Sequence, residues 1–150
     1  MLFRSIARGA LDDLRQLGLA KRARGARTTL RESPVFHTDL ARLEAKWRAA
    51  KALQQQTLAT VWGEVLETGE LTLAQRGDLR LATTHAIREA TDVVGEVYRL
   101  AGSTAIFENQ PFERRFRDAH AVSQQVQGRH TNYETVGRLM MDLEPDMMFL

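Results

Sequence analysis

The residues best able to do chemistry gather between positions 113 and 125. This segment holds acidic, basic, imidazole and amide side chains at close spacing: Glu113, Arg114, Arg115, Arg117, Asp118, His120, Ser123, Gln124 and Gln125. On a helix, Arg117, His120 and Gln124 fall on one face, because residues three and four apart lie above one another. A guanidinium, an imidazole and an amide presented together suit a heteroaromatic ligand with carbonyl groups and ring nitrogens.

A simpler interpretation of the same segment is a solvated helix. Two pairs of opposite charge stand four residues apart and would form ion pairs on its surface: Glu113 with Arg117, and Arg114 with Asp118. Such pairs stabilise a helix by roughly 0.3–0.5 kcal/mol each. The residue types alone leave the ligand-binding face and the solvated face equally open.

Each of two histidines stands four residues before another side chain that could bind a metal ion. Glu89 follows His85 at this spacing, and Gln124 follows His120. Side chains at this spacing on a helix can ligate one metal ion. The sequence has no Glu-x-x-His repeat of the di-iron bundles, so we interpret both histidines as surface or core-edge residues and expect no metal site. It also lacks the GxGxxG, P-loop, HExxH and GxSxG motifs, so no short motif names a reaction.

The composition narrows the class of protein. The chain has 150 residues, enough for one domain, and residues 1–150 are predicted to form a single one. It has no cysteine, which excludes disulfides and thiolate chemistry and favours an intracellular, cytoplasmic location. It contains no run of about 18 apolar residues and no compact apolar segment at its start, so neither a membrane span nor a secretory signal is expected.

Basic residues are concentrated near the start of the chain. The net charge is +2, but residues 1–35 carry eight basic and three acidic residues and so account for +5. This basic arm, densest from Lys21 to Arg31, could meet a phosphate-bearing ligand or nucleic acid, or act as a mitochondrial presequence. Asp12 and Asp13 disfavour the presequence, and the lack of aromatic residues in the cluster disfavours single-stranded nucleic acid. We interpret the arm as a solvated connector between helices and expect no nucleic-acid partner.

Apolar residues recur at helical spacing along most of the chain, and no segment alternates as a strand would. The spacing predicts five helices with these approximate ranges: 2–19, 39–67, 73–101, 112–127 and 131–141. Gly69 is a C-cap candidate, and Leu71–Thr72 lead directly into the third helix, so the two long helices must be antiparallel. The predicted fold class is all-α: an up-down four-helix-type bundle with an extra short C-terminal helix.

Local signals add detail at the helix ends. Ser33 or Thr38 can cap the second helix, and Pro111 stands at a favoured position to open the fourth. The tail EPDMMFL, residues 144–150, has no helical pattern, and we expect it to be frayed or to dock on a partner.

Four segments together resemble one protein family: SIARGALDDL (5–14), YRLAGSTAI (98–106), PFERRFRDAHAVSQQ (111–125) and YETVG (133–137). In this order they resemble the C-terminal helical domain of the acyl-CoA dehydrogenase superfamily, in the branch that includes flavin-dependent monooxygenases. The family pattern of an alanine–glycine turn, a proline, a large apolar residue and two arginine positions is matched in sequence by Ala101-Gly102, Pro111, Phe112, Arg114 or Arg115, and Arg117-Asp118. The resemblance covers essentially the whole chain.

The resemblance implies a flavin, FAD or FMN, held partly by Arg117, His120, Gln124 and Gln125. It also implies a departure from the family's chemistry. The histidine that the monooxygenase branch places beside the flavin falls at Gln125, and the glutamate with which acyl-CoA dehydrogenases abstract the α-proton falls near Gln127. An amide does not titrate in the useful range, so neither position can be catalytic. His120, about 140° away around a continuous helix, cannot replace Gln125.

The resemblance further implies that two family domains, an N-terminal helical domain and a middle β domain, are absent here. We therefore expect the bundle of a flavin-dependent oxidoreductase, inactive alone, that offers flavin-facing surface and oligomer contacts. Its partners would be further copies, as a dimer or tetramer, or a chain that supplies the missing domains. The alternative is a catalytically silent helical module for self-association or docking.

Overall fold

The computed structural model describes residues 2–22 and 25–150, so Arg24 of the basic arm lies outside the described residues. In these described residues, five α-helices form the fold: α1 (Leu2–Ala20), α2 (Pro34–Thr68), α3 (Leu73–Ala101), α4 (Phe112–Ser123) and α5 (Thr131–Met140). Four short 3₁₀ helices connect or follow them: η1 (Leu30–Glu32), η2 (Gly102–Ile106), η3 (Val126–Gly128) and η4 (Met147–Phe149). The described residues contain no strand beyond one isolated bridge between Arg22 and Thr29, which confirms the all-α prediction.

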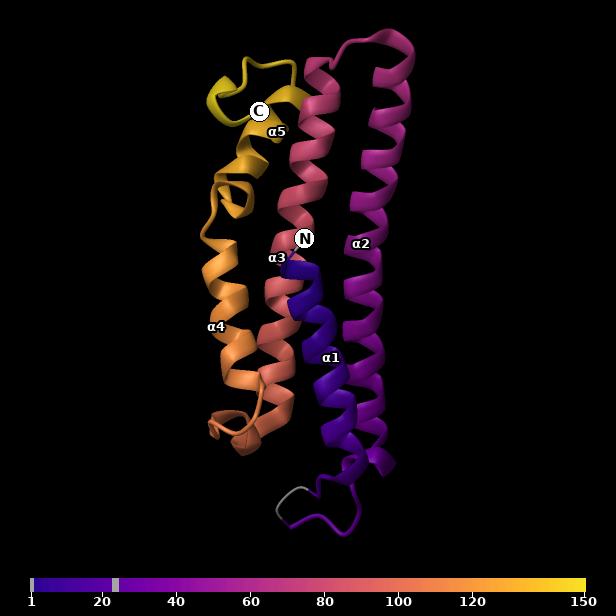
Figure 1. Cartoon of the computed structure of the whole chain (residues 1–150), viewed down its shortest axis with the longest axis vertical. Helices are drawn as coiled ribbons and strands as arrows, with labels where there is room; N and C mark the ends of the chain where they lie inside the picture. Colours follow the sequence, from indigo (N-terminus) through magenta and orange to yellow (C-terminus); the bar gives the residue numbers. More distant parts are fainter. Residues whose placement is uncertain (1, 23–24) are drawn as a thin grey trace.

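The helices form a bundle around α3, which contacts each of the other four (Figure 1). α2 and α3 run antiparallel along the length of the molecule, as the short connection between them predicts. α1 lies over the pair only along their lower half as drawn, and α4 and α5 follow one another along the other side of α3 (Figure 1). No helix in the described part of the chain is long and apolar enough to cross a membrane.

The core is built from small and branched side chains of α3 and α1. On α3, Val93, Val94 and Val97 are almost completely buried, and on α1, Leu11 and Leu14 are. Alanines occupy many other core positions on these helices and on α4: Ala7, Ala10, Ala86, Ala90, Ala101 and Ala119. Small side chains let helix axes approach closely, so burial here depends on tight fit rather than on large residues.

Most helix ends lie where the sequence signals place them. Gly69 ends α2 in the left-handed conformation (φ 74°), and Thr72 opens α3 in a capping box with Gln75. α2 begins at Pro34, five residues before the predicted start at Asp39. Of the two candidate caps, Ser33 is the one used, because its hydroxyl accepts a hydrogen bond from the backbone N–H of Phe36.

The predicted extent of the fourth helix, to about Gln127, is wrong, because α4 ends at Ser123. The hydroxyl of Ser123 donates to the carbonyl of His120 at 2.7 Å, and the chain then folds back into η3. Gly128 in η3 packs so closely on the end of α4 that an added Cβ would lie 2.6 Å from the backbone oxygen of Ser123. A glycine brought against the helix end by tertiary packing therefore sets this boundary.

The described residues of the basic arm contact the helices on both sides. The backbone N–H of Leu30 donates to the carbonyl of Lys21 at 2.9 Å, closing a loop between α1 and η1. The Nζ of Lys21 donates to the carbonyl of Ala101, the last residue of α3. Burial lowers the pKa of this ammonium group, which nevertheless sits where a helix C-terminus favours a cation. The described part of the arm thus ties α1 to the end of α3.

Candidate functional site

α4 carries the polar stripe that the sequence predicts. Arg117, His120 and Gln124 follow one another at helical spacing, since the C-cap Gln124 keeps a helical backbone (φ −80°, ψ −10°). All three are exposed. The Nε of Arg117 lies 2.9 Å from a carboxylate oxygen of Glu113, one turn earlier. The stripe is therefore open to a ligand and also carries the surface ion pair expected of a solvated helix.

His120 lies at the edge of an open groove between α2, α3 and α4. Its ring centroid is 4.2 Å from that of Phe116, which is 4.9 Å from that of Tyr98, so the three rings form one aromatic wall. The groove has a volume of about 600 Å³, and four charged residues line it: Lys46, Asp92, Glu96 and Arg99. An aromatic wall beside charged groups can take up a planar ligand by stacking.

Gln125 does not belong to the stripe. Its backbone is extended (φ −68°, ψ 157°) and leads from α4 into η3. The expectation that His120 and Gln125 are separated by 140° around one helix is wrong, because no continuous helix joins them. The structure brings Arg117, His120 and Gln124 onto one face and turns the chain away from that face at Gln125.

The junction between α4 and α5 is held by a buried hydrogen-bond network. The amide nitrogen of Asn132 donates to the carbonyls of Val126 and Gln127, at 2.9 and 3.2 Å, and to the hydroxyl of Thr84 at 3.0 Å. That hydroxyl donates in turn to the carbonyl of Gln127 at 2.8 Å. Thr84 is 0% exposed and Asn132 is 4% exposed. Bonds of this kind in a dry environment fix the backbone of η3 against α3.

Neither Thr84 nor Asn132 belongs to the site residues predicted from the sequence. One sequence signal could have pointed to a buried hydrogen bond at Thr84. This polar residue shares the helical spacing of the buried residues Ile87 and Val94. A buried hydroxyl needs a partner. Periodicity can therefore identify Thr84 as a residue with a buried hydrogen bond, but it does not identify Asn132, 48 positions away.

The side chain of Gln127 lines a small hollow of about 310 Å³ beside the first half of α3. Leu150 also lines it, so the tail, expected to be frayed or to dock on a partner, folds back onto this chain. The other lining residues come from the start of α3 and the loop before it: Leu71, Arg76, Leu79, Arg80 and Thr83. His120 and Gln127 thus line different hollows, and the structure does not bring these two predicted site residues together.

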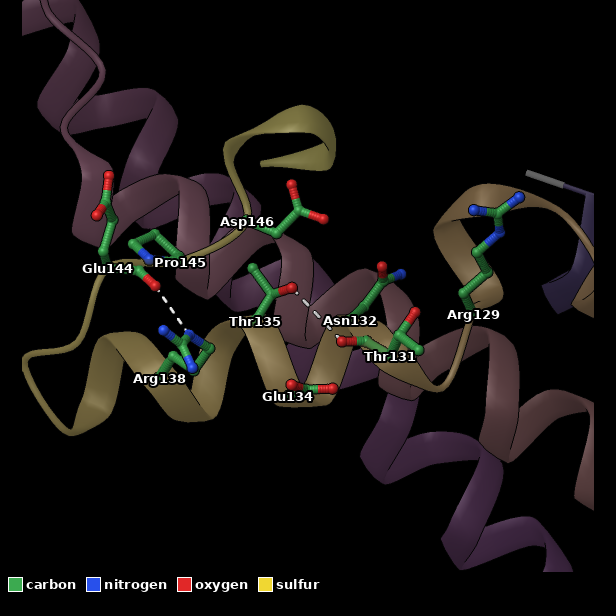
Figure 2. A pocket seen from close by; sticks show the side chains of 9 residues that line it. All are labelled: Arg129, Thr131, Asn132, Glu134, Thr135, Arg138, Glu144, Pro145 and Asp146. Carbon is green, nitrogen blue, oxygen red and sulfur yellow. Dashed lines mark hydrogen bonds between the residues drawn. The ribbon is translucent and has the colours of Figure 1, made fainter.

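A third hollow, of about 590 Å³, lies along α5 and the tail (Figure 2). Nine side chains line it: Arg129, Thr131, Asn132, Glu134, Thr135, Arg138, Glu144, Pro145 and Asp146. The Nε of Arg138 donates to the carbonyl of Glu144 at 2.8 Å and ties the tail to α5 (Figure 2). Charges of both signs mix here, and within residues 2–22 and 25–150 no group of three or more His, Cys, Asp or Glu could hold a metal.

The His85–Glu89 pair is part of an ionic cluster between α2 and α3. The two side chains are 3.9 Å apart, and the Nζ of Lys46 lies 3.1 Å from Glu89 and 3.2 Å from Asp92. Burial alone would lower the pKa of Lys46, but its bonds to the two carboxylates outweigh that effect and raise the pKa above its ordinary value. Glu89 is thus engaged by an ammonium group, which agrees with a core-edge role for His85.

Comparison with known proteins identifies the fold. The family model described as "Acyl-CoA dehydrogenase, C-terminal domain" matches residues 5–129. Indole-3-acetate monooxygenases from Acinetobacter baumannii and Pseudomonas putida are 32% and 29% identical over 140 residues, which cover 93% of this chain and 36% of each relative. The chain therefore spans about a third of the length of these relatives.

A solved structure agrees in shape. XiaF from Streptomyces sp., in complex with FADH2 and glycerol, superposes with a TM-score of 0.91 and 17% identity, over 99% of this chain and 38% of XiaF. At this identity the likeness shows the fold alone. The match over residues 5–129 goes further, and it shows that the chain belongs to the family of acyl-CoA dehydrogenase C-terminal domains.

Proposed function

We propose that this chain is the helical-bundle part of a flavin-dependent, monooxygenase-like oxidoreductase. The observation that carries the proposal is that nearly the whole chain matches one part of a larger protein: 93% of the chain aligns with only 36% of each of two monooxygenases. Both relatives are named for the oxidation of an aromatic acid, and XiaF was solved with a reduced flavin. Hydroxylation is thus better supported than oxidation of an acyl-CoA.

The exposed groups on α4 fit a flavin. The guanidinium of Arg117, the imidazole of His120 and the amide of Gln124 can donate to the carbonyl oxygens and ring nitrogens of an isoalloxazine. A bound reduced flavin would supply the electrons for activating oxygen. This chain's own part would be to bind and orient one side of the ring, whether the cofactor is FAD or FMN.

The isolated bundle should have no catalytic activity. Gln125 and Gln127 stand where the family's histidine and glutamate are expected, and neither amide can hold or release a proton near neutral pH. Further domains, or a further subunit that carries them, would have to complete the flavin site.

The cytoplasmic location expected from the lack of cysteine also stays a prediction.

A chimera tests the proposal. The bundle would replace the corresponding C-terminal part of the Acinetobacter baumannii relative, and flavin binding would be followed by absorbance and by co-elution in gel filtration. We expect the chimera to retain flavin and the isolated bundle to bind little or none. Arg117→Ala with His120→Ala should weaken retention, whereas Asp118→Ala, on a different face of α4, should not. A folded chimera without flavin, beside a flavin-binding parent, would refute the proposal.

One observation favours the second candidate, a docking or self-association module. Leu58, Trp62 and Leu66 follow one another on α2 at four-residue spacing and are all exposed, Trp62 by 62%. Four exposed methionines lie near the C-terminus: Met140, Met141, Met147 and Met148. Apolar surface of this kind marks contact sites. Sedimentation should show a dimer or tetramer that Trp62→Glu weakens and Val35→Glu does not; a strict monomer would exclude self-association.

A further inference from the structure

The hollow lined by Gln127 has an unusual charge. Arg76 and Arg80 stand one turn apart on α3, and like charges at this spacing destabilise a helix. Within the described part of the chain, neither guanidinium has an ion pair or a hydrogen bond. On α4, by contrast, every arginine pairs with a carboxylate: Arg114 with Asp118, Arg115 with Asp13, and Arg117 with Glu113.

The nearest acid in the sequence does not neutralise this pair. Asp78 lies between the two arginines in sequence, but it lines a different groove, between α2 and α3, together with Leu53 and Glu64. The hollow beside Gln127 has no acidic side chain among its lining residues. The lining side chains therefore present two positive charges beside apolar surface.

The remaining walls are suited to the body of a small ligand. Leu71, Leu79 and Leu150 supply apolar surface, while Thr83 and Gln127 supply a hydroxyl and an amide. The volume of about 310 Å³ lies at the lower end of the range for ligand pockets. Guanidinium groups bind carboxylates through two parallel hydrogen bonds, which gives both affinity and orientation.

We propose that this hollow binds a small monocarboxylate with a compact apolar body, its carboxylate held by Arg76 and Arg80. The backbone of Gln127 is fixed by Thr84 and Asn132, which holds this residue at the hollow. The inference goes beyond the proposed function, because it needs no flavin and no further domain.

Benzoate and benzamide form a matched pair of probes, since they share a shape and differ in charge. Titrating each into the isotope-labelled full chain, followed by amide NMR shifts, should show saturable binding of benzoate centred on residues 71–83 and 126–128. Benzamide should bind at least about tenfold more weakly, as expected when charge-assisted bonds are lost. The same loss is expected for benzoate with the double variant Arg76→Gln, Arg80→Gln, whose fold is checked by circular dichroism.

Arg42→Gln is the matched control, because Arg42 lies on α2 beside Asp39 and remote in sequence from the hollow. It should bind benzoate as the unaltered chain does. Equal binding of the two probes, benzoate shifts confined to residues 21–31, an equal loss in the control, or no binding would each overturn the proposal. Because no flavin is present, such a failure would leave the flavin experiment unaffected.

Discussion

The guanidinium of Arg115 on α4 lies directly against Gly9 on α1, at the place where any side chain at position 9 would collide with it. Arg115 also forms an ion pair with Asp13, one turn further along α1, and both partners are partly buried. Gly9 lies inside α1 and does not have a positive φ, so its backbone is that of an ordinary helical residue. The glycine therefore leaves room for the guanidinium of Arg115 and does not serve a turn.

This packing predicts a non-additive double-mutant cycle. Arg115→Met should lower the free energy of unfolding by roughly 1–2 kcal/mol, because it leaves Asp13 without its partner. In that background Gly9→Ala should stabilise α1 by about 0.5–1 kcal/mol, the usual helix preference for alanine. In the unaltered chain the same substitution should gain less or destabilise. Urea denaturation gives all four values, and an equal effect of Gly9→Ala in both backgrounds would contradict the contact. The control Arg114→Met, at an exposed pair, should change stability by less than about 0.5 kcal/mol.

The buried network at the α4–α5 junction predicts a strong effect of Asn132→Ala. Removing the amide takes one buried donor from each of the carbonyls of Val126 and Gln127, and Gln127 keeps only the bond from the Thr84 hydroxyl. The expected loss in the free energy of unfolding is about 2–3 kcal/mol. Asn109→Ala, at an exposed loop position, is the matched control and should cost under about 0.5 kcal/mol. Similar values for the two variants would show that the network does not stabilise the fold.

Two glycines should respond in opposite directions to alanine. At Gly128 an added Cβ meets backbone atoms of Ser123 at 2.6 Å, so Gly128→Ala should destabilise by about 1–3 kcal/mol. At Gly137 on α5 the same atom meets open space, so Gly137→Ala should stabilise by up to about 1 kcal/mol. Thermal unfolding of both variants tests this. A neutral Gly128→Ala would mean that η3 shifts freely at the end of α4.

Glu44 should make stability depend on pH on the acid side. Burial raises the pKa of this carboxyl group, but hydrogen bonds from Arg8 and Arg48, each at 2.7 Å, outweigh that effect and hold the pKa below its ordinary value of 4.5. As pH falls, the unfolded chain takes up the proton first. The stabilisation is therefore complete above about pH 4.5 and is lost as pH falls through the lower folded value.

The measurement is urea denaturation of the unaltered chain and of Glu44→Gln between about pH 3 and pH 7. Near neutral pH the variant should be less stable by at most about 1 kcal/mol, and this difference should shrink below about pH 4.5. Glu67→Gln, at an exposed position near the end of α2, should follow the unaltered chain throughout. A difference that stays constant down to pH 3 would contradict the depressed pKa.

The helices could be predicted where their boundaries depend on local signals. α3 begins and ends at the predicted residues, because Thr72 and Gln75 form a capping box and Gly102 adopts a positive φ of 57°. The end of α4 could not be predicted. It depends on Gly128 packing against both Ser123 and Ile87, a residue 41 positions earlier in the chain. No pattern within the segment itself records that contact.

In the candidate site, too, local spacing predicts some features and long-range contacts decide the others. The stripe of Arg117, His120 and Gln124 follows from helical spacing and is present on α4. The separation of His120 from Gln127 does not follow from spacing, because it depends on where α4 ends. Long-range contacts therefore decide which predicted residues can act on one ligand.

The turn after α4 keeps its form whichever side chain occupies position 127. The side-chain hydrogen bonds that tie it to α3 and α5 come from Thr84 and Asn132 and end on backbone carbonyls. Bonds within the turn join backbone groups, such as the N–H of Gly128 and the carbonyl of Gln125, so the Gln127 side chain has no part in holding it. The shape of the turn is thus set by residues other than Gln127. We therefore expect that an acid, a base or an inert group can be exchanged at this one position within the same architecture.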